Sequence, residues 1–353
     1  MVASIDVVVI GAGAVGSSTA WWLAREGRSV LLAEQFSAGH TRGSSHGAVR
    51  IFRFAYCDPE LVAMAQEALP LWRELEADCG EVLIEQSGAV DHGPAETIDR
   101  IAVALTRRRV RHERLPGADL SERFAGLRFD EVAVFHPDGG RTFADRTVAA
   151  LHRRAADHGA DVRFDCPTRI VAAGDDEVEL DVAGETVRAA RVVVASGAWA
   201  SDVLGAADVG PLPRLAVTQE HVVHFAPLDD ALVWPSFIHH GPTGDLARYG
   251  LPSIDEGVKV GVHHDGPEIT ADAQLDELDA DQVARIVDYA REWIPGVAPE
   301  PQHGATCLYT TTPDERFVVE RRGPIVVGSA CSGHGFKFTP LTGRRLARLA
   351  TER

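Results

Sequence analysis

Three glycines near the start of the chain have the spacing with which many proteins hold a dinucleotide. Gly11, Gly13 and Gly16 follow the apolar run 7–10 and precede residues that favour a helix. The first glycine permits a tight turn, the second lets a pyrophosphate approach the backbone, and the third lets helix and strand pack closely. Free N–H groups at the start of the helix would attract the phosphates. This pattern predicts an adenine dinucleotide site and leaves NAD and FAD as alternatives.

A carboxylate completes the same unit. Residues 28–34 have the pattern of a second strand, and Glu34 stands 18 residues after Gly16. A ribose-binding acid occupies this place in the dinucleotide motif. Because the glycines alone are a weak signal, the prediction depends on strand, glycines, helix and acid together.

A second candidate for chemistry lies in the segment 257–263, where valines alternate with other residues. On a strand the valines would share one face, and Lys259, Gly261 and His263 would share the other. From the pattern alone, the favoured interpretation of that second face is the solvated side of an edge strand. A functional lysine is the alternative.

The apolar pattern also predicts the elements that must position these residues. Helices are expected over 15–26, from Pro59 to Gly80, and over 146–158, 281–294 and 341–351. Strands are expected at 7–10, 28–34, 160–164, 178–182, 186–188, 191–199 and from 324 onward, with β-hairpins and loops from about 82 and a β-rich stretch at 213–262.

Local signals refine two of these segments. Asp58 is the expected N-cap of the second helix, and Pro70 is expected to kink that helix. Arg50 and Arg53 stand three residues apart, so on a helical turn they would share a face.

The overall composition limits the partners of the protein. Its 353 residues are enough for two domains, and 45% of them are hydrophobic and 25% charged, as in an ordinary soluble enzyme. A net charge of −17 argues against nucleic acid and anionic membranes, because both favour a basic surface. The five cysteines are scattered, odd in number and without a C-x-x-C pair, and no apolar run approaches a membrane span. We therefore expect a cytoplasmic protein.

Three separated pieces of sequence together resemble one family. They are 11–16 with Ser44-Ser-His-Gly-Ala-Val-Arg-Ile-Phe-Arg53, then Thr306-Cys-Leu-Tyr309, and finally Gly333-His-Gly-Phe-Lys337. In this order they resemble the monomeric sarcosine oxidase and N-methyl amino acid oxidase group of the D-amino-acid-oxidase-like FAD oxidoreductases. The resemblance spans nearly the whole chain and favours FAD over NAD.

The resemblance implies an α/β fold (α+β in its two-domain layout). A Rossmann-like FAD-binding domain would comprise residues 1–82, 145–211 and 313–353. A discontinuous substrate domain with a mixed sheet would comprise 83–144 and 212–312. Nucleotide-type units at the start, middle and end of the chain, with β-rich insertions between them, agree with this division.

Two residues acquire specific roles from the resemblance. Cys307 matches the cysteine that forms a thioether to the flavin 8-methyl group, although most free cysteines are small buried hydrophobes. Lys259 matches the lysine under the flavin ring that promotes reaction with oxygen, where a cation would stabilise superoxide as it forms. Gly261 would leave room for the flat ring. Cys331 lies outside the motif position and is interpreted as structural.

The substrate carboxylate is expected between Arg53 and Lys337, the first offering a bidentate fork and the second a point charge. Other implied substrate contacts are Tyr309, His334, Ile238 and Tyr249. Catalytic positions near the flavin are Lys259, Arg50, His46 and, more weakly, His263. The implied cofactor contacts are Gly11, Gly13, Ala14, Val15, Gly16, Glu34, Gln35, Arg42, Ser44, Ser45, Ile170, Ser196, Gly197, Trp199, Cys307, Gly333, Gly335, Phe336 and Lys337.

One segment departs from the family pattern. Where the family has an apolar wall of the substrate pocket, this chain has Phe237-Ile-His-His-Gly241. The two histidines leave the substrate's side chain open. We expect no metal there, because adjacent histidines on a strand point to opposite faces.

The predicted reaction is the oxidation of the C–N bond of a secondary amino acid, either N-methylated or a cyclic imino acid. A hydride equivalent would pass to flavin N5, the imine would hydrolyse, and oxygen would be reduced to hydrogen peroxide. The partners would be this small substrate and oxygen, and the protein would be a monomer or weak homodimer. Two alternatives remain: a flavin dehydrogenase that passes electrons to another acceptor, and a flavin-binding partner subunit that is inactive alone.

Overall fold

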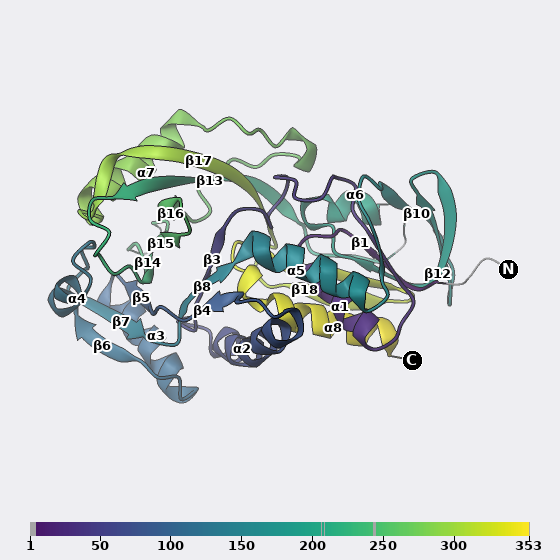
Figure 1. The fold of residues 1–353 in the computed structure, drawn as a ribbon, viewed down its shortest axis with the longest axis horizontal. Helices are drawn as coiled ribbons and strands as arrows, with labels where there is room; N and C mark the ends of the chain where they lie inside the picture. The colour runs from purple at the N-terminus through teal and green to yellow at the C-terminus, as the bar shows by residue number, and fades with distance from the viewer. Residues whose placement is uncertain (1–4, 206, 208, 243–244, 353) are drawn as a thin grey trace.

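The computed structural model describes residues 5–205, 207, 209–242 and 245–352, which form two large sheets, a small sheet and the helices around them (Figure 1). The first sheet has the strand order β10-β11-β12-β1-β2-β9, and β19 pairs with β12 and with β18. Its strands are β1 (Ile5–Ile10), β2 (Val30–Ala33), β9 (Asp161–Arg163), β10 (Thr168–Ala173), β11 (Val178–Val182), β12 (Glu185–Val194), β18 (Val318–Arg322) and β19 (Ile325–Ser329).

The centre of this sheet is parallel and buried on both faces. β1 lies between β2 and β12 and pairs in parallel with both. Val7 and Val9 join the core under the helices, whereas Val8 and Ile10 join the core on the opposite face. Because both faces are covered, the strand is a continuous apolar run, which is the signal that the sequence provides.

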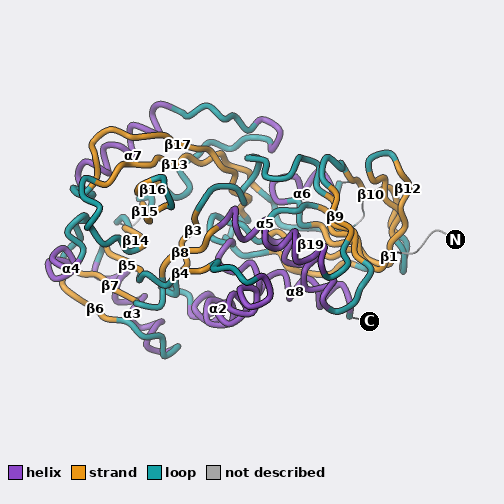
Figure 2. Tube along the Cα trace, viewed as in Figure 1, coloured by secondary structure: helices purple, strands orange, loops and turns teal. Residues whose placement is uncertain are grey.

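Four long helices cover one face of the first sheet, and they lie together in Figure 2. They are α1 (Ala14–Arg25), α2 (Pro59–Cys79), α5 (Ala144–Asp157) and α8 (Thr339–Thr351). The short helices α6 (Ala200–Leu204) and η1 (Gly197–Trp199) follow β12. None of the described helices is long and apolar enough to cross a membrane.

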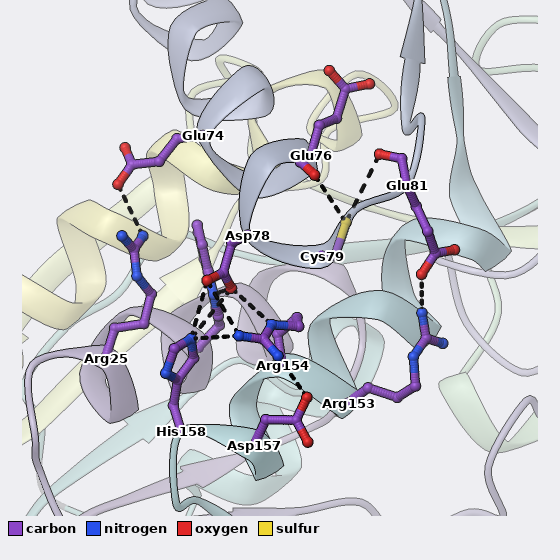
Figure 3. A network of polar contacts seen from close by, with 11 residues as sticks. Arg25, Glu74, Glu76, Asp78, Cys79, Glu81, Arg153, Arg154, Asp157 and His158 are labelled. Carbon is purple, nitrogen blue, oxygen red and sulfur yellow. Dashed lines mark hydrogen bonds and ion pairs between the residues drawn. The ribbon is translucent and has the colours of Figure 1, made fainter.

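A polar network ties α1, α2 and α5 together (Figure 3). Asp78 of α2 accepts hydrogen bonds from Trp21 Nε1 at 2.8 Å and Arg154 Nε at 3.0 Å, and His158 lies at 3.2 Å. Burial alone would raise the pKa of Asp78, but these hydrogen bonds, with that of Arg154 first, lower it to about 2. The network therefore holds the C-terminal parts of the three helices together at neutral pH.

The second sheet has the strand order β17-β13-β16-β15-β14-β5-β7-β6. Its strands are β5 (Ala89–His92), β6 (Glu113–Pro116), β7 (Val132–His136), β13 (Ala216–Pro227), β14 (Ser236–His239), β15 (Arg248–Ser253), β16 (Gly257–Val262) and β17 (Val297–Thr311). Figure 1 shows β13 and β17 as a long antiparallel arch with α7 (Ala280–Trp293) against it. Helices α3 (Ala95–Arg107) and α4 (Gly117–Arg123) lie beside β6 and β7, and η2 (Ala271–Ala273) precedes α7.

A small sheet stands between the two large ones. It consists of β3 (Val49–Phe52), β8 (Gly140–Phe143) and β4 (Ile84–Glu85), and β3 contacts both β15 and η3 (Phe336–Phe338). The sequence suggested a helical turn around Arg50 and Arg53, and this is wrong. Arg50 lies on β3, where it pairs with Thr142, and Arg53 follows the end of the strand.

Most long elements agree with the sequence. The five predicted helices are present within two residues of their expected ends, and α2 begins after Asp58, whose carboxylate accepts a hydrogen bond from Glu60 N. The helix continues through Pro70, where a kink was expected. The expected strand 186–188 and the first part of the expected strand 191–199 form one strand, β12, which ends at Val194, whereas 197–199 form η1. Helix α3 was missed within a region expected to contain only hairpins and loops.

The α/β class with mixed sheets is confirmed, whereas the domain boundaries stay a prediction. The first sheet takes its strands from 5–33, 161–194 and 318–329, and the second takes its strands from 89–136 and 216–311. The segments thus alternate along the chain, as a discontinuous layout requires.

Candidate active site

One cavity of about 1030 Å³ lies where the glycine turn, the small sheet and the second sheet meet. It brings together residues from nearly every part of the chain, including almost all of the predicted site residues. The predicted residues that line it are Gly11, Gly13, Ala14, Val15, Glu34, Gln35, Arg42, Ser44, Ser45, His46, Arg50, Arg53, Ser196, Gly197, Trp199, Ile238, Tyr249, Lys259, His263, Cys307, Tyr309, Gly333, His334, Gly335, Phe336 and Lys337.

Two predicted residues, Gly16 and Ile170, do not line the cavity. A Cβ added to Gly16 would stand 1.9 Å from Gly11 O, so this glycine allows close packing of helix on strand. Ile170 lies on β10 with 2% of its surface exposed, in the core on the face away from α1. Thr168, two residues earlier, lines the cavity instead.

The glycine turn has the shape that a phosphate needs. Gly11 has a φ of 98°, and a Cβ there would stand 2.7 Å from Ala195 O, so both conformation and space require glycine. A Cβ on Gly13 would meet Ser45 Oγ at 3.0 Å, and this hydroxyl accepts a hydrogen bond from Ala14 N. The N-terminus of α1 therefore faces the cavity, close to the hydroxyl of Ser45.

Glu34 holds the turn and the end of β2 together. Its carboxylate is 6% exposed and accepts hydrogen bonds from Ala12 N at 2.8 Å and from Phe36 N at 3.1 Å. His152, which the sequence did not single out, contacts Ala12 O from α5 at 2.8 Å. Glu34 thus borders the cavity, as the motif predicts, and its contact with a ribose stays a prediction.

Lys259 lies on a central strand, so the interpretation as a solvated edge strand is wrong. β16 is flanked by β13 and β15, and Lys259 is 7% exposed. Burial, with the Arg50 guanidinium nearby, lowers the pKa of Lys259 to about 7. Gly261 has a different role from the one expected, because a Cβ there would meet the Tyr249 ring at 2.8 Å. It makes room for a tyrosine of the wall.

Cys307 lies close to the same two cations. It is on β17 and opposes Glu220 of β13 in the sheet. Burial raises the pKa of the Cys307 thiol, and Arg50 and Lys259 oppose that rise. Cys331, interpreted as structural from the sequence, also lines the cavity. All five cysteines are free thiols.

Arg53 and Lys337 both line the cavity and both lie near the ring of Tyr56, which the sequence did not single out. The Arg53 Cζ lies 4.1 Å and the Lys337 Nζ lies 5.7 Å from the centroid of the tyrosine ring. Lys337 donates a hydrogen bond to His334 O at 2.8 Å and is 5% exposed. Burial, assisted by the charge of Arg53, lowers its pKa well below the usual value. A bound anion between Arg53 and Lys337 would offset both the cost of burying the Lys337 charge and its repulsion from Arg53.

A buried acid that the sequence missed balances Arg53. Asp91 on β5 is fully buried, and its Oδ1 lies 3.1 Å from Arg53 Nη1 and 2.8 Å from His240 Nε2. Its Oδ2 lies 3.4 Å from His136 Nε2. Burial by itself would raise the pKa of Asp91, but Arg53 and the two histidines hold it well below its usual range. Arg53 is therefore held in place before a ligand binds.

Three imidazoles that line the cavity, those of His46, His263 and His334, are neutral at neutral pH. Burial is the main cause, and it lowers the pKa of His46 to about 4, that of His334 to about 3 and that of His263 well below its usual value. His263 Nδ1 lies 3.4 Å from the Tyr309 hydroxyl. These three imidazoles therefore add no positive charge to that of the arginines and lysines.

Several buried polar atoms of the wall have no partner among the described residues. Ser196 Oγ, Arg42 Nε and His46 Nε2 line or adjoin the cavity and make no hydrogen bond, and neither does the Tyr56 hydroxyl. Such atoms are costly to bury unless a ligand or water satisfies them. These atoms are distributed from the glycine turn to the surroundings of Arg53. This distribution fits a long, polar, anionic cofactor together with a small substrate.

The glycine turn follows the central strand of a sheet that is parallel at its centre, and a second sheet with buried cations closes the cavity. Together these features define a dinucleotide-dependent oxidoreductase. The chain belongs to the family of FAD dependent oxidoreductases, whose model matches residues 6–349. This result confirms the choice of FAD over NAD and the resemblance carried by the three motifs.

Individual relatives are similar over nearly the full length. A monomeric sarcosine oxidase from Bacillus sp. (strain NS-129) is 33% identical, a match that covers 98% of this chain and 92% of that protein. An N-methyl-L-tryptophan oxidase from Yersinia pestis (strain Pestoides F) is 27% identical, with 99% and 95% covered. The solved structure of NikD, described as an unusual amino acid oxidase essential for nikkomycin biosynthesis, has a TM-score of 0.87 at 30% identity, with 99% and 94% covered.

The composition of the chain distinguishes two of the residues that line the cavity, Lys259 and Lys337. Of its 35 lysines and arginines only two are lysines, and both, Lys259 and Lys337, line the cavity. A chain that uses arginine almost everywhere else keeps lysine at two sites where a compact, titratable cation lies beside a buried ligand.

We expect the two lysines to titrate far below ordinary lysines. With [ε-13C]lysine incorporated, the protein should give two signals, and that of Lys259 should titrate near pH 7 because burial disfavours its charged form. The signal is assigned by its loss in Lys259→Met, with Lys337→Met as the matched control. Titration of both signals near pH 10.4, the ordinary value, would contradict the electrostatic description of the cavity.

Proposed function

We propose that this protein is an FAD-dependent oxidase of secondary amino acids, N-methylated or cyclic, that releases an imine for hydrolysis and reduces oxygen to hydrogen peroxide. The observation that carries the proposal is the pair of buried cations, Arg53 and Lys337, in the same cavity as the glycine turn. The relatives named sarcosine oxidase and N-methyl-L-tryptophan oxidase support the substrate class.

The first task of the chain is to fix the substrate's carboxylate. Arg53 is oriented by Asp91 and offers the rest of its planar fork to the cavity, and Lys337 adds a point charge. A bound carboxylate would favour the charged form of Lys337, whose pKa burial lowers. Binding of the substrate carboxylate and protonation of Lys337 are therefore coupled.

The second task is to keep the reacting amine neutral and dry. The imidazoles of His263 and His334 carry no charge at neutral pH, and Tyr309 and Tyr249 are buried with raised pKa values caused mainly by that burial. None of these groups is a strong base. The site therefore favours a substrate that loses its ammonium proton on binding, with its amine held near the centre of the cavity.

The residues that would hold FAD follow from the lining of the cavity. The glycine turn and the α1 N-terminus suit the pyrophosphate, Glu34 suits the ribose, and Cys307 would carry the thioether. When bound, FAD supplies the two-electron oxidation of the substrate C–N bond. The buried polar atoms of Ser196, Arg42 and His46 would gain partners from it.

Lys259 provides a cation where oxygen would react. It stands between the large cavity and a side cavity of about 70 Å³ that also touches Cys307 and Arg50. This volume exceeds the roughly 30 Å³ that one water molecule occupies in the liquid, so dioxygen would fit. Charge there would stabilise the developing superoxide. We further propose a cytoplasmic monomer or weak homodimer with the two-domain division given above.

Replacing Lys337 should weaken recognition of the carboxylate. We expect Lys337→Met to raise KM, and the Kd of a simple carboxylate inhibitor such as acetate, roughly 10- to 100-fold, because a charge-assisted hydrogen bond is lost. Flavin content should stay unchanged. Lys259→Met is the matched control and should leave acetate binding intact. Unchanged acetate binding in Lys337→Met would remove this residue from the substrate site.

Replacing Lys259 should separate the two half-reactions. In stopped-flow experiments, Lys259→Met should reduce the flavin with substrate almost as the unaltered protein does, but should slow reoxidation by oxygen roughly 100-fold or more. Because Lys259 is protonated below its pKa of about 7, the unaltered protein should lose oxygen reactivity as pH rises through or above that value. Lys259→Met should show no such pH dependence.

Two outcomes of that experiment would contradict the proposal in different ways. If both half-reactions survive in Lys259→Met, the lysine has no role in oxygen reduction. If the unaltered protein itself is reduced by substrate but consumes no oxygen, the protein is a dehydrogenase.

The covalent link is tested by acid precipitation of the purified protein. We expect the yellow colour to stay in the pellet because a thioether through Cys307 resists acid, and to move to the supernatant in Cys307→Ser. Cys331→Ser is the control and should keep the colour in the pellet. Release of the flavin from the unaltered protein would exclude the thioether and leave the fold unaffected.

A further inference from the structure

A cluster of metal-ligating side chains lies outside the active-site cavity. β5 and β14 run in parallel, and their register places His92 opposite His239. The two imidazoles stack with centroids 4.1 Å apart. Asp130, just before β7, brings a carboxylate oxygen to 3.1 Å from His92 Nδ1 and 3.0 Å from His239 Nε2. Three donor atoms from three chain segments therefore lie within 4.8 Å of one another.

The cluster uses the face of the two strands that is turned away from the substrate. Along β5, Asp91 points to Arg53 and His92 points to the cluster. Along β14 and just beyond it, His240 contacts Asp91 while His239 contacts Asp130. The adjacent histidines diverge as expected, but each meets partners from other segments that the sequence does not bring together.

We propose that His92, Asp130 and His239 form a binding site for a divalent transition-metal ion of the zinc class. Two imidazole nitrogens and one carboxylate oxygen are a ligand set that zinc and its neighbours prefer over magnesium or calcium. This inference replaces the expectation of no metal in the segment 237–241.

The distances suit such an ion. Ligands at about 2.0–2.2 Å from a tetrahedral zinc lie roughly 3.3 Å apart, close to the separations of 3.0 and 3.1 Å seen between the carboxylate oxygen and the two nitrogens. All three donor atoms lie within 4.8 Å of one another. The two stacked rings must tilt toward each other for both nitrogen lone pairs to point to one metal ion.

The surroundings favour a metal in two further ways. His239 Nδ1 lies 3.3 Å from the Tyr289 hydroxyl, a contact that orients the ring and presents Nε2 to the metal position. Trp293 and Phe129 pack against the two imidazoles as an apolar shell. The Asp130 side chain is 31% exposed, so solvent reaches one side of the site and can supply a fourth ligand.

Arg248 is the nearby cation, and it is paired with Asp245 at 2.7 Å.

A second cluster in the described part of the chain serves as a built-in control. His224, Glu256 and His303 also group their donors, but the histidine–carboxylate distances are longer, at 3.7 and 3.8 Å. Lys259 lies near enough to lower the pKa of His224, after the larger effect of burial. Its positive charge disfavours a metal cation there.

The test is metal binding by the flavin-loaded protein after treatment with a chelator. Calorimetric titration with Zn2+ should give one tight equivalent, and Co2+ should give the visible absorption bands of a tetrahedral site. Asp130→Asn and His239→Gln should each weaken binding at least 10-fold. His303→Gln, in the second cluster, should leave it unchanged. Zn2+ should also raise Tm in the unaltered protein and not in Asp130→Asn.

Flavin absorbance and Tm without metal show whether each variant is folded, and Asp130→Asn keeps the size of the side chain. Binding that is absent in the unaltered protein, or unaffected by Asp130→Asn, would overturn the proposal and leave a hydrogen-bonded His–Asp–His group. Loss of binding in His303→Gln would move the site to the other cluster. None of these results depends on oxidase activity.

Discussion

The desolvation of positive charge is the constraint on which the site depends. Arg50, Arg53, Lys259 and Lys337 line one cavity in a chain whose net charge is −17. Burial lowers the pKa of both lysines, so their charge is costly until an anion arrives. Among the described residues, Asp91 is a carboxylate partner of Arg53, and the other three cations have none. This part of the cavity is therefore prepared for negative charge, which agrees with a substrate that carries a carboxylate.

The two large sheets position different parts of the cavity. The parallel sheet supplies the glycine turn and buries both of its faces, which makes this end of the cavity rigid. The antiparallel arch of β13, β16 and β17 supplies Lys259 from β16 and Cys307 from β17, the two strands that flank β13. β3 stands between the two large sheets. It brings Arg50 and Arg53 to the part of the cavity that both sheets line.

The paired strands β5 and β14 carry two polar clusters, one on each face of the pair. On one face Asp91 and His240 hold Arg53, and on the other His92 and His239 share Asp130. A change that shifts the register of this pair would disturb both groups. The departure from the family pattern at 237–241 therefore alters more than the wall of the pocket.

The sequence determined the features that depend on local periodicity or on a motif. The glycine turn, five long helices and the α/β class were predicted, and nearly all of the predicted site residues line the cavity, because burial on both faces and a phosphate turn leave local signatures. Only the tertiary structure decided that Lys259 is central, that Gly261 serves Tyr249, and that Asp91 and Tyr56 support Arg53. Those relations join residues that are distant in the sequence or lie on different strands, and the order and register of strands are set by long-range packing that no local pattern encodes.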